Sequence, residues 1–318
     1  MAKKNWYPAL TLFFLAPMIG ELLSGSAPPL EFFNPVVFIM LALSYGCSAV
    51  IIRELVCRWK KGWNSIFVLG AAYAFVNEGL SAKSFFDPNW IDIGILGHYG
   101  RLFGINWVWS FGLIAYHIII SISIPILIVT LIFPKQNSLP WISRRMFNAL
   151  GILLIADTIF IYFNISEFRV PLIYLIATIA SIAILIFAAK RVPEIKYISK
   201  KVNVPKARWF WLVGFLAAFV FFLVFDGLPK SGIHPIISVS MIAAVILIAV
   251  WLVYRMSCSF SAWRDKHRLA LSSGVLGALI LFTPVLEFEK HMAGMVAVGA
   301  SFAAFLVWLN RAIVNREK

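Results

Sequence analysis

The sequence predicts an all-α integral membrane protein, a bundle of about ten transmembrane helices with the N-terminus and the C-terminus both cytoplasmic. The composition, the length of the apolar runs and the distribution of basic residues lead to this prediction. Hydrophobic residues make up 61% of the chain and charged residues 13%, whereas about a quarter of the residues of a soluble domain are charged. We therefore expect a multi-pass protein of the cell membrane.

Ten apolar runs are long enough to cross a bilayer, because a spanning helix needs roughly 17 to 25 residues. We expect a single integral membrane domain over 1–318, with a polar, loop-bearing half at 1–164 and a plainer apolar half at 165–318. The ten runs cover residues 8–23, 35–52, 63–80, 105–133, 147–163, 170–189, 208–225, 234–254, 269–286 and 291–309.

The basic residues follow the positive-inside rule at every connection. With a cytoplasmic N-terminus, only five of the 28 Lys and Arg residues fall on the outer side: Lys83, Arg101, Arg169, Lys230 and Lys290. The net charge of +14 therefore indicates contact with membrane lipids, above all at the basic inner loop 190–208, and not with nucleic acid. Arg53 and Glu54, at the inner end of the second run, are expected to anchor that helix with their charged heads reaching water.

Four ionisable residues interrupt the apolar runs in their outer halves or near their middles: Glu21, Glu78, His117 and Asp157. Such residues are costly in a membrane and mark a functional site by default. His117 lies about 18 Å along its helix from the outer end, at 1.5 Å per residue, whereas Glu78 lies near the outer end of the preceding helix. We therefore expect an acidic and aromatic cavity that opens outward and narrows from Glu78 towards His117.

Glu78 and His117 are the expected catalytic pair, with Asp157 tuning His117. An imidazole exchanges protons near neutral pH, and a carboxylate is a suitable partner for general acid–base catalysis. Structural roles remain open for each residue. Glu21 can extend to the membrane surface, His117 can fill a packing position, and Asp157 can bind a hydroxyl group on a neighbouring helix.

The 24-residue loop Ser81–Gly104 is long for a simple connection and too aromatic for a solvated linker, so we expect it to pack over the outer mouth. Asp87 precedes Pro88 and Asn89, which is also the composition of a turn. No His or Cys spacing predicts a metal site, and no Gly-rich phosphate loop predicts a cofactor. The expected substrate-binding residues are Glu21, Lys83, Asp87, Trp90, His98, Arg101 and Trp107.

Glu78 and His117 resemble part of the motif set of the CAAX-processing intramembrane glutamic proteases. That family carries Glu-Glu-x-x-x-Arg on one helix, Phe-x-x-x-His on a later helix and His-x-x-x-Asn further on. Here Asn77 precedes Glu78, Lys83 follows five residues later, and Leu113 stands four residues before His117. The third motif is missing, so the resemblance implies similar proton-transfer chemistry and not membership.

Three functions are compatible with these residues. The leading hypothesis is a membrane-embedded hydrolase or transferase that acts on a membrane-borne lipid or peptide substrate by Glu/His general acid–base chemistry. The alternative is a proton-coupled secondary transporter of a small molecule, with Glu78 and Asp157 as its proton sites. Ten helices would suit two inverted halves of five, although no internal repeat aligns. The third is a membrane scaffold or regulatory subunit, in which the charged residues only hold helices together.

Overall fold

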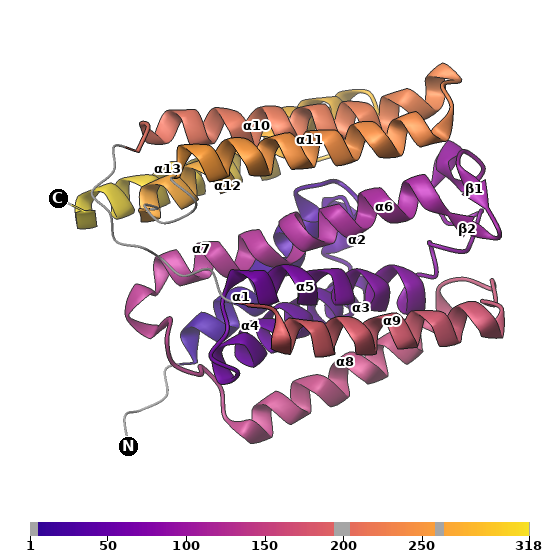
Figure 1. Cartoon of the computed structure of the whole chain (residues 1–318), viewed down its shortest axis with the longest axis horizontal. Helices are drawn as coiled ribbons and strands as arrows, with labels where there is room; N and C mark the ends of the chain where they lie inside the picture. Colours follow the sequence, from indigo (N-terminus) through magenta and orange to yellow (C-terminus); the bar gives the residue numbers. More distant parts are fainter. Residues whose placement is uncertain (1–5, 194–203, 258–263, 318) are drawn as a thin grey trace. The chain divides into compact units, whose positions relative to one another are not determined.

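The computed structural model describes residues 6–193, 204–257 and 264–317 (Figure 1). Each of the ten predicted runs coincides with a helical segment in these ranges, which confirms an all-α, polytopic membrane bundle. The number of spans and the side of each terminus stay predictions, and residues 194–203 of the basic loop lie outside the described ranges. Eight segments are long and apolar enough to cross a membrane: Pro35–Arg58, Trp107–Ile132, Arg144–Asn164, Leu172–Arg191, Ala207–Ser231, Pro235–Met256, Asp265–Phe288 and Met295–Arg316.

The chain divides into two compact units. Helix α9 (Leu172–Arg191) packs against α5 (Trp63–Ala74) and belongs to the first unit, so the boundaries of the units differ from those of the halves 1–164 and 165–318. The single membrane domain over 1–318 stays a prediction. The first unit comprises Met1–Gly20, Pro35–Glu194 and Pro229–Val239, and the second comprises Glu21–Asn34, Ile195–Leu228 and Ser240–Lys318.

Three helical segments that lie wholly within the first unit each contain a π-helical stretch. A π turn holds an extra residue and is frequent at functional sites. Pro125 lies two residues after the end of the third stretch, and its missing N–H leaves a carbonyl of the preceding turn without its helical partner. The segments are α3 (Pro35–Leu41), η2 (Ala42–Cys47) and α4 (Ser48–Arg58); α5 and η3 (Phe75–Ser81); and α6 (Trp107–Tyr116), η5 (His117–Ser123) and α7 (Ile124–Ile132).

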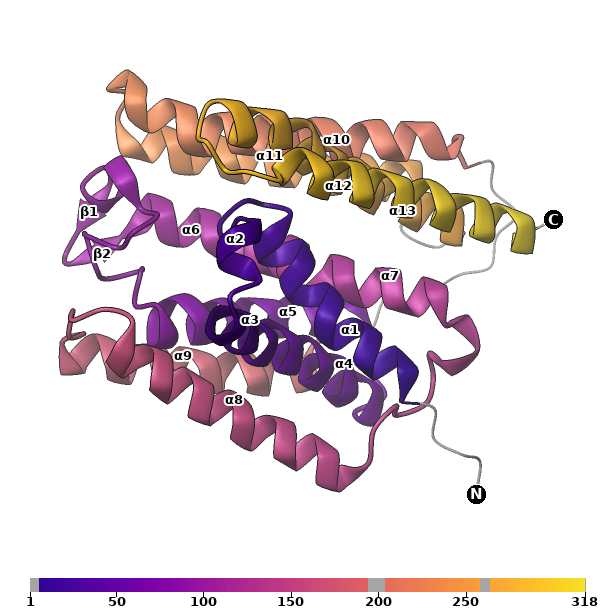
Figure 2. The same cartoon turned by 180° about the vertical axis from the view of Figure 1, so that it is seen from behind.

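Close helix packing brings the π-helical stretches together. Helix α1 (Tyr7–Pro17) packs against η2 and α4, as Figure 2 shows, and α5 packs against η5. A Cβ atom on Gly46 would lie 2.3 Å from the carbonyl oxygen of Phe13, and one on Gly70 would lie 3.0 Å from Cα of Ile118. Only glycine allows these backbones to approach so closely. Helix α8 (Arg144–Asn164) contacts both η2 and η3.

The loop between η3 and α6 is folded, as its aromatic content predicted. It contains the short helix η4 (Gly94–Gly97) and the antiparallel strands β1 (Arg101–Leu102) and β2 (Ile105–Asn106). Phe85 and Phe86 are buried. The side chain of Asn106 donates hydrogen bonds to the carbonyl oxygens of Ser84 (2.8 Å) and Asp87 (3.0 Å), which ties the end of the loop to its beginning.

Arg53 and Glu54 form a buried ion pair, so the prediction that their heads reach water was wrong. The two side chains are 4% and 0% exposed, and Nη1 of Arg53 lies 2.8 Å from Oε1 of Glu54. Nη2 of Arg53 also donates to the carbonyl oxygens of Gln136 (3.1 Å) and Asn137 (2.9 Å). Its guanidinium lies 3.5 Å from the centre of the Trp141 ring. The loop between α7 and α8 therefore covers the pair and supplies its partners.

The second unit contains α10, most of α11, α12 and α13, which lie alongside one another in Figure 1. Glycines bring α10 and α12 into backbone contact. A Cβ atom on Gly214 would lie 2.2 Å from the carbonyl oxygen of Leu271, and one on Gly274 would lie 2.0 Å from that of Trp211. The helices are α10 (Ala207–Phe222), α11 (Pro235–Met256), α12 (Asp265–Phe288) and α13 (Met295–Glu317).

The short elements of the two units not named above are η1 (Met18–Leu22), α2 (Pro29–Phe32), η6 (Pro134–Gln136), η7 (Leu223–Gly227) and η8 (Leu228–Ser231).

Candidate functional site

Glu78 of η3 and His117 of η5 form a buried pair in the first unit. Oε1 of Glu78 lies 2.9 Å from Nε2 of His117, and the residues are 6% and 2% exposed. The structure thus brings the two predicted residues together. The expectation that Glu78 lies much nearer the outer membrane surface than His117 was wrong, because their side chains are in contact. η3 ends three residues after Glu78, whereas α6 begins ten residues before His117.

Three side chains donate hydrogen bonds to the Glu78 carboxylate. Nδ2 of Asn77 (2.9 Å) and Nε2 of His117 (2.9 Å) donate to Oε1, and the hydroxyl group of Ser84 donates to Oε2. A buried carboxylate is tolerated only when such donors replace water. The carboxyl group of Glu78 is therefore held in place by groups from η3, η5 and the loop after η3.

Both ring nitrogens of His117 have partners. Nδ1 lies 2.9 Å from Oγ of Ser121, one helical turn further along η5. Because Nε2 faces a carboxylate, the neutral ring carries its proton there and accepts a hydrogen bond from Ser121 at Nδ1. The ring of Tyr73 packs edge-on against the imidazole, with 5.2 Å between ring centres. The geometry therefore fixes the orientation of the imidazole, with Nδ1 facing the Ser121 hydroxyl group.

An outer layer of neutral side chains supports this pair. Oγ of Ser44 donates to Oδ1 of Asn77 (2.9 Å), and Nε1 of Trp109 donates to Oγ of Ser84 (2.8 Å). Sequence reasoning missed these residues because neutral hydrogen-bonding side chains occur throughout such a chain. The spacing of Ser121 four residues after His117 was the one available signal. The missed residues of the site are Ser44, Tyr45, Asn77, Ser84, Trp109 and Ser121.

Asp157 lies on α8, the helix that contacts η2 and η3, and is 5% exposed. Its Oδ2 atom is buried and makes no hydrogen bond to the described part of the chain. The two nitrogens of His117 are taken by Glu78 and Ser121. Asp157 therefore bonds to neither nitrogen, and any influence on His117 acts through space.

Lys83 is fully buried and binds three backbone carbonyl groups, one in the last turn of α8 and two in the segment that follows this helix. Its Nζ donates to the oxygens of Tyr162 (2.7 Å), Ser166 (2.7 Å) and Phe168 (3.0 Å). The last carbonyl groups of a helix have no partner within the helix and attract cations. All three ammonium protons are used in this way, so substrate binding by Lys83 would require one of these bonds to break.

Asp87 shares this part of the loop and forms the turn that its neighbours predicted. Oδ1 accepts a hydrogen bond from the backbone N–H of Asn89 (2.9 Å), and Oδ2 accepts one from Oγ of Ser166 (2.8 Å). Burial lowers the pKa of Lys83 from its usual range, and Arg169 lowers it further, whereas Asp87 acts in the opposite direction. Asp87 and Lys83 thus both attach the loop to the end of α8.

The remaining predicted contact residues differ in burial, and one of them belongs to the other unit. His98 and Trp107 are exposed, and Trp90 and Arg101 are partly buried. Arg101 binds the side chain of Asn106 across the strand pair. Glu21 is partly buried in the second unit. Within the described ranges, no group of three or more His, Cys, Asp or Glu side chains is placed to hold a metal ion.

Comparison with known proteins identifies a family and no individual relative. No curated protein and no solved structure matches the chain. Residues 10–315 match the model of a family described as "Uncharacterized membrane protein family". This match covers nearly the whole chain and agrees with the apolar helices of the structure. The chain belongs to this family and is an integral, multi-pass membrane protein.

Proposed function

We propose that the protein is a membrane-embedded hydrolase or transferase whose Glu78–His117 pair performs general acid–base chemistry on a membrane-borne lipid or peptide substrate. One observation carries the proposal, a chain of two hydrogen bonds from Ser121 through His117 to Glu78. Both bonds are 2.9 Å long. A hydroxyl group, an imidazole and a carboxylate in this order form the constellation that activates a serine for acyl transfer on unrelated folds.

The proton balance of such a reaction fits the observed contacts. The Ser121 oxygen attacks the carbonyl carbon of an ester or amide, and its proton passes to Nδ1 of His117. Glu78 stabilises the resulting imidazolium through Nε2. The imidazolium then gives the proton to the departing alcohol or amine. Water releases the acyl group from Ser121 in a hydrolase, and a second alcohol or amine takes it in a transferase. The two ring nitrogens have exchanged roles relative to the usual triad.

The surroundings support a chemical role over a purely structural one. Each polar group buried among apolar helices costs stability unless it is paired, and this site holds a carboxylate, an imidazole and several hydroxyl groups. All residues of the site except Ser84 and Trp109 lie on π-helical stretches of three separate segments: Ser44 and Tyr45 on η2, Asn77 and Glu78 on η3, and His117 and Ser121 on η5. π-Helical turns are frequent at functional sites.

A test uses membranes that contain the full chain and a fluorophosphonate probe, which reacts with activated serines. We expect labelling of the wild type and loss of labelling in Ser121→Ala, Glu78→Gln and His117→Gln. General acid–base groups contribute about a hundredfold or more to rate, so the two neutral variants should react slower by at least that factor. Ser181→Ala on α9 and the exposed Glu167→Gln are the matched controls. Full labelling of Ser121→Ala would remove the covalent mechanism.

A second experiment tests the enzyme class itself. Lipid and peptide profiles are compared between cells that lack the protein and cells complemented with each variant. We expect the wild type and Glu167→Gln to restore the profile, and Glu78→Gln and His117→Gln to fail. Restoration by both site variants would place the chemistry elsewhere.

The transporter remains the second candidate because of Asp157. This acid is buried in the same unit, and its Oδ2 atom has no hydrogen-bond partner within the described residues. A carrier of protons needs an acid that can gain and lose a proton inside the membrane. Proton uptake into vesicles that contain the purified protein, abolished by Asp157→Asn and retained in Ser121→Ala, would favour transport over catalysis.

A further inference from the structure

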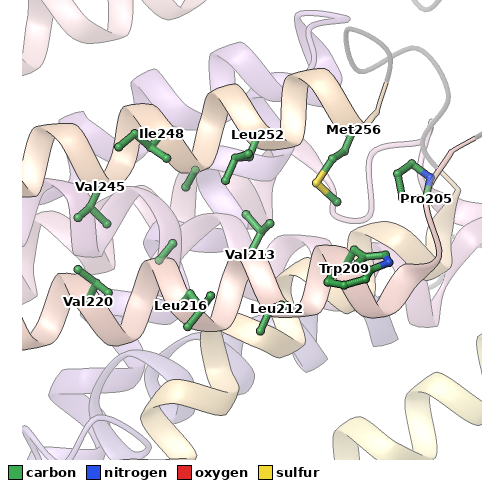
Figure 3. A pocket seen from close by; sticks show the side chains of 12 residues that line it. Pro205, Trp209, Leu212, Val213, Leu216, Val220, Val245, Ile248, Leu252 and Met256 are labelled. Atoms are coloured by element: carbon green, nitrogen blue, oxygen red, sulfur yellow. The ribbon is translucent and has the colours of Figure 1, made fainter.

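The second unit contains an apolar groove between α10 and α11. Figure 3 shows their side chains facing one another along its length. We name it the acyl groove; its volume is about 530 Å³, and its lining includes Trp209, Val213 and Val220 of α10 and Val245 and Met256 of α11. Both helices are candidate membrane spans. The groove is therefore expected to meet lipid and not water.

The length of the groove matches one layer of a bilayer. Trp209 and Val220, at its two ends on α10, are eleven residues apart, or about 16 Å at 1.5 Å per residue. Half of a hydrocarbon core of roughly 30 Å is about 15 Å. An extended acyl chain that starts at the membrane surface would thus run along the groove and end near the middle of the bilayer.

One end of the groove has the composition of a headgroup region. Trp209 is 48% exposed there, and tryptophan prefers the level of the lipid headgroups. Figure 3 shows Trp209 and Met256 at this end of the groove. Three exposed basic residues are close to them in the sequence: Lys206 and Arg208 at the start of α10, and Arg255 next to Met256 at the end of α11. None of the three forms an ion pair with another residue of the described ranges.

The start of α12 adds further positive charge at the same end. Phe210 lies against His267 and Phe219 lies against Phe282, with 5.0 and 5.7 Å between ring centres, so α10 and α12 run parallel. The first residues of α12 include Lys266. The acid beside it, Asp265, already faces Arg268 at 4.0 Å. The end of the groove at Trp209 is therefore basic, and its remainder is apolar.

We infer that the acyl groove is a specific binding site for an anionic phospholipid, with one acyl chain between α10 and α11 and its phosphate beside Lys206, Arg208 and Arg255. The apolar length, the tryptophan and the basic end together match one such molecule, whereas a zwitterionic lipid carries a cationic group beside its phosphate and is attracted less strongly by the three bases. The site lies within the second unit and does not depend on the chemistry proposed for Glu78 and His117.

The test uses the full chain in vesicles of three parts phosphatidylcholine to one part phosphatidylglycerol. A trace of either lipid carries a photoreactive group on its acyl chain. We expect the phosphatidylglycerol probe to cross-link to peptides from 209–220 and 245–256, several-fold more than the phosphatidylcholine probe. Juxtamembrane bases attract anionic lipid by an amount equivalent to about fivefold each. The double variant Lys206→Gln/Arg208→Gln should therefore lower phosphatidylglycerol labelling about tenfold or more.

Two further variants separate the groove from general lipid contact. Ala217→Phe with Ala249→Phe fills the groove from both helices and should abolish labelling by both probes. The controls are Arg144→Gln with Arg145→Gln, two exposed bases at the start of α8, and the exposed Ala180→Phe on α9; these should label like the wild type. Should the filled variant fail to fold, the charge variant still decides.

Three results would overturn the inference. The first is equal labelling by phosphatidylglycerol and phosphatidylcholine. The second is labelling of 209–220 and 245–256 that neither the charge variant nor the filled variant lowers. The third is a cross-link between these segments of two copies of the chain, which would make the groove a contact between protomers.

Discussion

Lys83 and Ser84 are adjacent in the sequence, yet their side chains attach the loop to two different helical segments. Ser84 donates its hydroxyl hydrogen to Oε2 of Glu78 in η3, and Lys83 binds carbonyl groups at the end of α8. Lys83 has a φ angle of 63°, a left-handed conformation that non-glycine residues rarely adopt. The loop is thus held directly against the carboxylate of the candidate site.

Replacement of Ser84 tests whether this hydroxyl group links Glu78 to Trp109. Ser84→Ala removes a donor to a buried carboxylate and an acceptor for the Trp109 indole, and we expect it to lower the free energy of unfolding by about 1 to 3 kcal/mol. In the wild-type background, Trp109→Phe should also lower the free energy of unfolding, because the indole loses its hydrogen bond to Ser84. In the Ser84→Ala background its hydrogen-bond contribution should vanish. Reversible denaturation in mixed micelles measures this cycle, and full additivity would argue against the link.

Lys83→Met should destabilise the end of α8. The substitution keeps the aliphatic length but leaves three carbonyl groups without their charged donor, which we expect to cost about 2 to 5 kcal/mol. Hydrogen exchange should increase in residues 162–168. The exposed Lys135→Met is the matched control and should change neither stability nor exchange; unchanged exchange in Lys83→Met would contradict the capping role.

Glu54→Ala should be far more harmful than substitution of an exposed acid such as Glu167. The change leaves the Arg53 guanidinium buried without its carboxylate, and the removal of one partner of a buried pair costs about 3 to 5 kcal/mol. The double variant Arg53→Met/Glu54→Leu removes both charges and should recover at least part of this loss. Thermal unfolding of the purified variants provides the comparison. A double variant less stable than Glu54→Ala would show that the pair contributes net stability.

Gly274→Ala should disrupt the packing of α10 on α12. The new methyl group would meet the carbonyl oxygen of Trp211 at 2.0 Å, and a backbone atom cannot move away as a flexible side chain can. Overpacking of this kind costs about 1 to 3 kcal/mol or more. Gly151 on α8 has no atom within 4 Å of the equivalent position, so Gly151→Ala should be neutral or slightly stabilising. Equal thermal shifts for the two variants would contradict the close approach.

The sequence alone determined the class of the protein and the location of its helices, because the length and apolarity of a spanning helix are local properties. It also singled out Glu78 and His117, since ionisable residues are rare within apolar runs. The role of these two residues stays a proposal, as do the contacts predicted for the loop residues.

Only the tertiary structure decided which neutral groups complete the site. Ser84 and Trp109 reach Glu78 because the loop folds back on η3, and no local pattern encodes that return. The same holds for Lys83, whose three partners lie about eighty residues away in the chain. A buried charge must find donors or acceptors wherever the folded chain brings them. The pair was therefore predictable from residue type, and its partners depended on packing.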